Sequence, residues 1–297
     1  MELKGIITPI ITPMHDDESV NYDELKNQIE RLIKGGVHGL FFFGTNGEAY
    51  ILSREEKIKI LETAVEAVKG RVPVYAGTGC VGTKDTIELS KAAEAVGVDV
   101  LSIISPYFAA ISQDELITHY TAVAKQVKTP IVLYNIPART GVNMAPATIG
   151  KLAEIDNIVG AKDSSGNFTN MLGYIEATKK RKDFAVLSGN DALILWCLIA
   201  GGKGGIAGCS NVYPENMVGI YENFVKGNME QARFCQERIG ALRSVFKYGN
   251  PNTVVKKAVK LLGYPVGECR APFNSLSAEG MEALKKVIAD YKQSDMR

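Results

Sequence analysis

The feature that most constrains the fold is a regular alternation of short apolar runs and helix-period segments. The apolar runs recur about every 20 to 35 residues, which is the spacing of parallel strands joined by crossover helices. They cover Gly5–Ile11, Val37–Phe43, Pro73–Ala76, Asp99–Ile104, Pro130–Tyr134, Ile158–Lys162, Ala185–Leu187 and Gly204–Ala207. Eight βα units without a linker predict an α/β fold, a (βα)8 TIM barrel. A doubly wound sheet is the alternative, but it normally has fewer strands and a visible break.

Helix signals agree with this alternation and continue beyond it. Ser53-Arg54-Glu55-Glu56 has the capping-box pattern that opens a helix. Further helices are expected over Asn21–Lys34, Gln113–Val127 and Pro214–Lys226, and after the eighth unit over Met229–Phe246, Thr253–Leu262 and Ala278–Lys292. We therefore expect residues 1–226 to form the barrel domain, and residues 227–297 to form a C-terminal helical extension packed on it.

Composition excludes several classes of protein. The 297 residues are 46% hydrophobic and 23% charged, with a net charge of +1 and both signs interspersed, so no nucleic-acid or anionic-membrane surface is expected. No apolar run approaches the roughly 18 residues of a membrane span, and the first residues do not resemble a secretory signal. Scattered histidines and five cysteines without a Cys-x-x-Cys pair indicate neither a metal site nor a disulfide framework, and suit the cytoplasm.

A lysine, Lys162, ends the sixth apolar run and is followed directly by turn residues. Such a lysine is costly unless it borders a cavity, where removal from water favours the uncharged amine, or snorkels to the solvent from the strand end. In a (βα)8 barrel, the chemistry takes place at the carboxyl ends of the strands. The ends of the second, fifth, seventh and eighth runs bring Thr45, Tyr134, Gly189 and Ile206 to that same end. The barrel prediction therefore favours a cavity beside Lys162.

The chemistry that these residues support is imine formation. An amine in a dry cavity attacks a ketone and, with loss of water, gives an imine whose positive charge acidifies the neighbouring carbon. Tyr134 on the adjacent strand is the natural proton carrier, and Thr45 can hydrogen-bond to its phenol oxygen. The turn Gly44-Thr45-Asn46-Gly47 offers backbone N–H groups to a substrate carboxylate. Taken singly, Tyr134 also fits an ordinary strand tyrosine and the turn a plain strand-to-helix connection.

A second pattern predicts a different class of enzyme. Gly77-Thr78-Gly79-Cys80-Val81-Gly82 matches G-x-G-x-x-G, and Asp99 follows about 20 residues later, as in a nicotinamide- or flavin-binding unit. The match lies in the third of eight units, however, whereas the dinucleotide fingerprint opens a doubly wound half. Glycines at a barrel mouth explain it more simply. A non-catalytic binding protein is the remaining alternative.

Four sequence blocks carry a resemblance to a known family. They are Gly44-Thr45-Asn46-Gly47-Glu48, Tyr134-Asn135-Ile136-Pro137-Ala138-Arg139-Thr140-Gly141, Gly160-Ala161-Lys162-Asp163 and Ser188-Gly189-Asn190-Asp191. With them the chain resembles the dihydrodipicolinate synthase / N-acetylneuraminate lyase family of pyruvate-dependent lyases and aldolases over nearly its whole length. The resemblance implies a barrel with C-terminal helices and a homotetramer.

The resemblance also assigns roles to individual residues. It implies that pyruvate is held as a Schiff base on Lys162, that Tyr134 is the acid and base, and that no cofactor is needed. Asn46 and the backbone around Gly189 and Ile206 would contact the pyruvate unit.

The second substrate is an aldehyde whose identity the resemblance leaves open. In the synthase branch, which condenses pyruvate with aspartate semialdehyde toward lysine, an arginine at the position of Arg139 binds the aldehyde's carboxylate. A guanidinium suits bidentate carboxylate recognition, and sugar-acid aldolases commonly lack it, so Arg139 favours the synthase. A 2-keto-3-deoxy sugar-acid or N-acetylneuraminate aldolase is the alternative.

Two positions depart from the synthase pattern. Asn46 stands where synthases usually have a second threonine, and Phe108 stands where they have the tyrosine that reaches the neighbouring subunit's active site to relay protons. Either Tyr107 replaces that relay between subunits, or water does, or the aldehyde is a different one. At the stretch that binds lysine in inhibited synthases this chain has Arg54, Lys57 and Val81, so we expect that lysine does not inhibit it.

Overall fold

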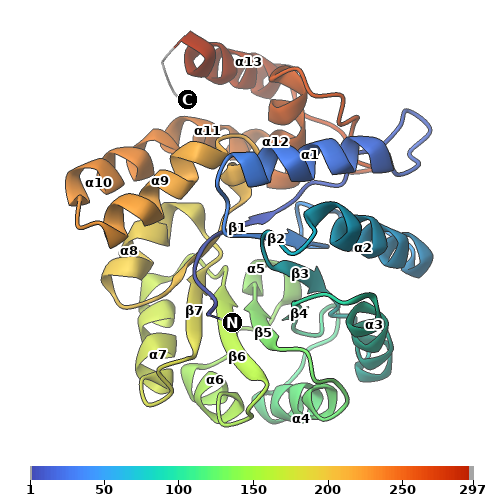
Figure 1. Ribbon diagram of the computed structural model, residues 1–297, viewed down its shortest axis with the longest axis vertical. Helices are drawn as coiled ribbons and strands as arrows, with labels where there is room; N and C mark the ends of the chain where they lie inside the picture. Colours follow the sequence, from blue (N-terminus) through green and yellow to red (C-terminus); the bar gives the residue numbers. More distant parts are fainter. Residues whose placement is uncertain (1, 294–297) are drawn as a thin grey trace.

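Eight parallel strands close into a barrel in which each strand pairs with its sequence neighbours and the last pairs with the first (Figure 1). The computed structural model describes residues 2–293. The strands are β1 (Gly5–Pro9), β2 (Gly39–Phe42), β3 (Val74–Gly77), β4 (Val100–Ile104), β5 (Ile131–Asn135), β6 (Ile158–Asp163), β7 (Ala185–Ser188) and β8 (Gly204–Ile206). The predicted TIM barrel is confirmed, and the doubly wound alternative is wrong.

Helices surround the barrel and continue past it. Those of the βα units are α1 (Tyr22–Lys34), α2 (Arg54–Val68), α3 (Thr83–Val96), α4 (Gln113–Ala124), α5 (Pro137–Thr140), α6 (Pro146–Leu152), α7 (Phe168–Thr178), α8 (Ile194–Ile199) and α9 (Pro214–Val225). The later ones are α10 (Met229–Arg238), α11 (Gly240–Ser244), α12 (Pro251–Leu261) and α13 (Ala278–Gln293). Short 3₁₀ turns are η1 (Asp191–Leu193), η2 (Gly208–Asn211) and η3 (Val245–Tyr248).

The element boundaries differ from the predicted ones in two places that matter. The predicted helix Met229–Phe246 is divided into α10, α11 and η3, and the division falls at Gly240, a residue of low helix propensity. Lys162 is not the last residue of β6, because the strand continues to Asp163, whose buried carboxylate accepts hydrogen bonds from Asn135 and Ser165. The predicted capping box is present: Ser53 and Glu56 exchange hydrogen bonds at the start of α2.

The apolar residues form layers inside and outside the strands. Within the barrel, Phe41, Tyr75, Val132 and Leu187 belong to one fully buried cluster that fills the interior below the carboxyl ends. A second cluster joins β1 and α8 to α9, α10, α12 and α13, so the C-terminal helices pack on one flank of the barrel (Figure 1). The division at residue 226 stays a prediction.

The described residues contain neither a membrane-spanning helix nor a cluster of metal ligands. None of the helices within residues 2–293 is both long and apolar enough to cross a membrane. The same residues contain no cluster of three or more His, Cys, Asp or Glu side chains placed to hold a metal ion.

Candidate active site

Lys162 lies between Tyr134 of β5 and Leu187 of β7 in the strand register, near the carboxyl end of the barrel. Its side chain is buried, with 4% of the residue exposed, so the lysine does not snorkel to the solvent. The Nζ atom lies 3.8 Å from the centroid of the Tyr134 ring and 5.2 Å from that of Phe41. Aromatic faces thus surround an amine that has no carboxylate in ion-pair contact among residues 2–293.

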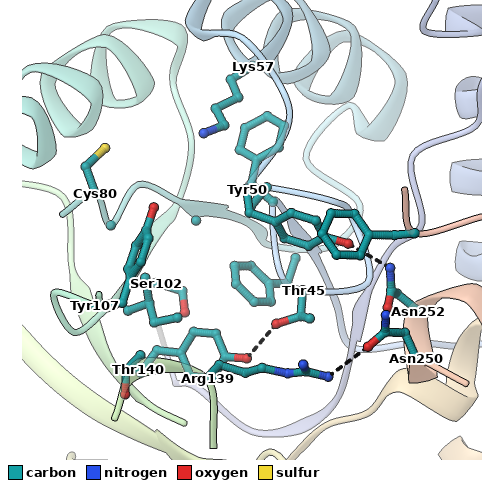
Figure 2. Close-up of a pocket in the computed structure, with 18 residues that line it drawn as sticks. Thr45, Tyr50, Lys57, Cys80, Ser102, Tyr107, Arg139, Thr140, Asn250 and Asn252 are labelled. Carbon is teal, nitrogen blue, oxygen red and sulfur yellow. Dashed lines mark hydrogen bonds between the residues drawn. The ribbon is translucent and has the colours of Figure 1, made fainter. Parts of the chain in front are cut away.

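Tyr134 and Thr45 are in contact. The Tyr134 phenol oxygen lies 3.3 Å from Thr45 Oγ1, and either hydroxyl can donate (Figure 2). Thr45 belongs to the turn after β2, where the Gly47 N–H donates to the Gly44 carbonyl at 3.0 Å and the Glu48 N–H donates to the Thr45 carbonyl at 3.2 Å. Because the turn itself uses the Gly47 N–H, that group is not free for a carboxylate, and the predicted anion nest is smaller than expected.

A cavity of about 230 Å³ opens above Lys162. All of the residues predicted to react with or bind substrate line it, apart from Tyr107: they are Thr45, Asn46, Tyr134, Arg139, Lys162, Gly189 and Ile206. Residues from five strand ends and from the short helix α5 therefore meet at one place, as the barrel prediction requires.

Tyr107 lies elsewhere. It lines a second cavity of about 270 Å³, which shares Thr45, Tyr134 and Arg139 with the first. Figure 2 shows its phenol turned toward Cys80 and away from Thr45. Burial raises the pKa of Tyr107. Its neighbour Phe108 is 99% exposed at a φ of 79°, so within this chain neither ring touches the lysine cavity. The intersubunit role of Tyr107 stays a prediction.

Gly189 is required by space. A Cβ atom there would lie 1.9 Å from Ser164 Oγ and 2.9 Å from Lys162 Cε, distances that no real side chain tolerates. The Gly189 N–H donates to the Asp163 carbonyl at 2.8 Å. A ligand can therefore contact the Gly189 Cα and carbonyl, but not its N–H.

Sequence reasoning missed the part of the cavity that comes from the C-terminal helices. Arg243 of α11, Phe246 of η3, and Pro251 and Val255 of α12 all line the lysine cavity. The Arg243 guanidinium has no ion pair among the described residues and lies 5.8 Å from the Phe246 ring centroid. These residues have no local pattern that marks them, because only the packing of the extension brings them to the barrel end.

Two further residues have contacts that the sequence did not predict: Asp191, quoted in a motif without a role, and Arg139, predicted to bind the aldehyde's carboxylate. Asp191 lines the cavity, and its carboxylate accepts the N–H groups of Gly208 at 3.0 Å and Cys209 at 2.8 Å. It thereby fixes the turn η2 after β8. Arg139 extends between the two cavities, where its guanidinium donates to Asn250 Oδ1 at 3.3 Å (Figure 2).

The glycines of the G-x-G-x-x-G match have a packing explanation. A Cβ atom on Gly77 would lie 2.3 Å from the Phe43 carbonyl oxygen, and one on Gly79 would lie 2.6 Å from the Ile104 side chain. The motif therefore allows close approach of neighbouring strands at the barrel mouth. The strands around it form a closed barrel, whereas the dinucleotide fingerprint functions in a doubly wound sheet.

Comparison with known proteins gives a consistent result. The sequence model of the dihydrodipicolinate synthetase family matches residues 2–291. The chain is 41% identical to the 4-hydroxy-tetrahydrodipicolinate synthase of Methanoculleus marisnigri over 97% of this chain and 99% of that one. Among solved structures, dihydrodipicolinate synthase from Thermotoga maritima matches with a TM-score of 0.95 and 30% identity over all of both chains.

A further solved structure is YagE of E. coli K12, a prophage protein of the dihydrodipicolinic acid synthase family determined in complex with pyruvate. It matches with a TM-score of 0.94 and 32% identity, over 98% of this chain and 99% of that one. On the family match across nearly the whole sequence, this chain belongs to the dihydrodipicolinate synthetase family.

Proposed function

We propose that this protein is a 4-hydroxy-tetrahydrodipicolinate synthase, which condenses pyruvate with aspartate semialdehyde. The observation that carries the proposal is the cavity above Lys162, where a buried amine without a carboxylate partner faces the hydrogen-bonded Tyr134–Thr45 pair. The names of the relatives support the same activity, since the chain aligns with these synthases over almost its full length.

The first half of the reaction forms an enamine on Lys162. The amine attacks the ketone carbon of pyruvate, and the carbinolamine loses water to give an imine. Tyr134, whose ring lies against the Lys162 amine, supplies the proton that leaves with the water, and Thr45 holds the phenol and exchanges the proton with it. The methyl group then loses a proton to the Tyr134 phenolate, and the imine nitrogen accepts the electron pair released. No separate cofactor is needed, because the imine itself is the electron sink.

The second half joins the aldehyde and releases the lysine. The enamine carbon attacks the aldehyde carbon, and the aldehyde oxygen takes a proton from Tyr134 to give a secondary alcohol. The amino group of aspartate semialdehyde then attacks the imine carbon, and the Lys162 amine leaves as the ring closes. One water is lost over the whole reaction.

The substrate contacts follow from the cavity. Asn46, Gly189 and Ile206 border the amine and contact the pyruvate unit. Arg139 lies on the wall toward the second cavity and binds the carboxylate of the aldehyde as a bidentate partner. We further propose that the enzyme is cytoplasmic and that it is a homotetramer. Sedimentation of the purified protein tests the oligomeric state directly.

Borohydride reduction tests the mechanism. With pyruvate present, reduction should attach a pyruvate-derived group to Lys162, detected by mass spectrometry of the peptide. Lys162→Ala should abolish the label. If that variant is still labelled, the proposed mechanism is wrong.

A coupled assay tests the second substrate. We expect turnover of pyruvate with aspartate semialdehyde to exceed cleavage of each member of a panel of 2-keto-3-deoxy sugar acids and N-acetylneuraminate. A preference for one of the panel would replace the synthase by an aldolase while leaving the imine mechanism intact.

A further inference from the structure

The turn that carries Thr45 and Asn46 is followed by a completely buried acid. Glu48 has 0% of its side chain exposed and forms an ion pair of 2.7 Å with Lys256 of α12, which is 1% exposed. The second carboxylate oxygen of Glu48 accepts the N–H of Arg270 at 2.8 Å, and the Lys256 amine also donates to the Glu268 carbonyl at 2.8 Å. Both charged groups are therefore satisfied, and both partners of Glu48 come from the C-terminal extension.

The backbone connects this ion pair to the active-site turn. Glu48 has a φ of 58°, the left-handed conformation, and its N–H donates to the carbonyl of Thr45 at 3.2 Å. The Thr12 hydroxyl holds the Gly47 carbonyl at 2.8 Å. A movement of Glu48 is thus passed through one hydrogen bond to Thr45, whose hydroxyl lies 3.3 Å from the Tyr134 phenol. That separation is near the long limit of a hydrogen bond, so a small shift breaks it.

Stability alone does not account for a buried ion pair at this position. Removing two charges from water offsets most of their attraction, and apolar side chains of similar size often stabilise a fold equally well. What the pair provides, and an apolar contact does not, is one defined geometry between α12 and the turn. The same helix brings Pro251 and Val255 to the wall of the lysine cavity, so α12 is already part of the site.

We propose that Glu48 and Lys256 are positioning residues for the condensation: their ion pair holds the active-site turn so that Thr45 stays in contact with Tyr134. The proposal rests on the imine mechanism above. It makes the C-terminal extension a determinant of turnover, because the extension holds the turn in place without supplying a reacting group.

Replacement of the whole pair separates positioning from stability. Glu48→Gln/Lys256→Met removes both charges and leaves none unpaired. We expect its melting temperature to stay within about 5 °C of the wild type. We expect kcat to fall at least about tenfold, because a displaced Thr45 no longer holds the proton carrier. The KM for pyruvate should change less than about threefold, since only Asn46 among the groups that contact pyruvate belongs to the turn, while Gly189 and Ile206 belong to other strand ends.

A neighbouring ion pair of the same extension provides the control. Lys260 of α12 has its Nζ atom 2.8 Å from Glu268 Oε1, and its side chain is 50% exposed. Lys260→Met removes a charge from the same helix without touching the turn, so its kcat should equal that of the wild type. A pair-replaced enzyme that is folded and turns over within twofold of the wild type overturns the proposal.

A second variant and a second measurement make the result decisive. If Glu48→Gln/Lys256→Met does not fold, Glu48→Gln/Lys256→Gln, which keeps a hydrogen bond between the two side chains, is measured in the same way. If neither variant folds, the ion pair serves stability alone and the positioning proposal is wrong. The rate of imine formation with pyruvate, followed by timed borohydride quenching, separates this proposal from the function. Absence of imine in the wild type refutes the function, whereas equal rates in wild type and variant refute the positioning role.

Discussion

Gly189→Ala should slow the enzyme by displacing its lysine. The new Cβ atom would lie 1.9 Å from Ser164 Oγ and 2.9 Å from Lys162 Cε. The Ser164 hydroxyl can rotate away, but the Lys162 Cε carries the reacting amine. Relief of the second contact must therefore move Nζ relative to Tyr134, whose ring centroid is 3.8 Å away.

The size of the effect follows from that geometry. Restoring an ordinary contact of roughly 3.5 to 4 Å requires a shift of about 1 Å. Misplacement of a reacting group by 1 Å costs about 10²-fold in rate, which corresponds to about 2.7 kcal/mol of barrier. Overpacking by one methyl group lowers the free energy of unfolding by about 1–3 kcal/mol. We expect kcat to fall about 100-fold in a protein that still unfolds cooperatively.

Steady-state kinetics measures the fall in kcat, and denaturant unfolding measures the loss of unfolding free energy. Gly189→Ala/Ser164→Ala removes the serine hydroxyl and should recover most of the stability, but little of the rate, since the lysine contact persists. Gly240→Ala is the matched control, because its Cβ would meet nothing within 4 Å. A Gly189→Ala enzyme with kcat within threefold of the wild type would refute the reasoning.

Four other predictions concern proton transfer, recognition, acid stability and regulation. Tyr134→Phe should lower kcat by about 10²–10⁴-fold, with the KM for pyruvate changed only a few fold, in steady-state assays. Arg139→Ala should raise the KM for aspartate semialdehyde and leave pyruvate labelling by borohydride unchanged; unaltered aldehyde kinetics would contradict its role. Burial lowers the pKa of His119 to about 4, so the unfolded chain binds more protons below pH 6.5, and stability falls as the pH drops. Urea unfolding should show a loss of about 3 kcal/mol between pH 7.5 and 4 that His119→Gln reduces. Lys57 lines the second cavity and its amine repels another cation there, so sub-millimolar L-lysine should leave turnover unchanged; half-maximal inhibition would refute this.

The parts of the structure that the sequence predicts are those with a local signal. Each strand is a short apolar run between turn residues, and the capping box predicts the helix that begins after Ser53. Each of these signals lies within a few consecutive residues. The positions of Lys162 and Tyr134 follow from the strands, because parallel strands of a barrel present their carboxyl ends together. The sequence predicts Asp163 outside the strand because it opens a run of turn residues; in the structure Asn135 and Ser165 donate hydrogen bonds to its carboxylate, which keeps it in the strand.

The parts that the sequence does not predict depend on contacts far apart in the chain. Glu48 and Lys256 are separated by 208 positions, and neither residue type marks a buried ion pair. Lysine and glutamate are usually exposed, and only the closed packing of α12 against the turn makes them partners. Arg243 also has no local signal: its sequence context fits a surface arginine of a helix, and only the packing of the extension brings it to the cavity.

The position of Arg243 changes how selection of the aldehyde should be understood. In the proposed mechanism, the groups around Lys162 that form the imine come from strand ends and βα loops, and they contact only the pyruvate unit. The outer wall instead contains two guanidinium groups, Arg139 from the barrel and Arg243 from the extension, with the carboxylate of Asp191 between β7 and β8. Arg139 is already hydrogen-bonded to Asn250 of the segment that precedes α12. Because the extension thus contributes Arg243 and hydrogen-bonds Arg139, changes at Arg243 and Asn250 should alter the choice of the second substrate, whereas changes at Lys256 should alter the chemistry at the lysine.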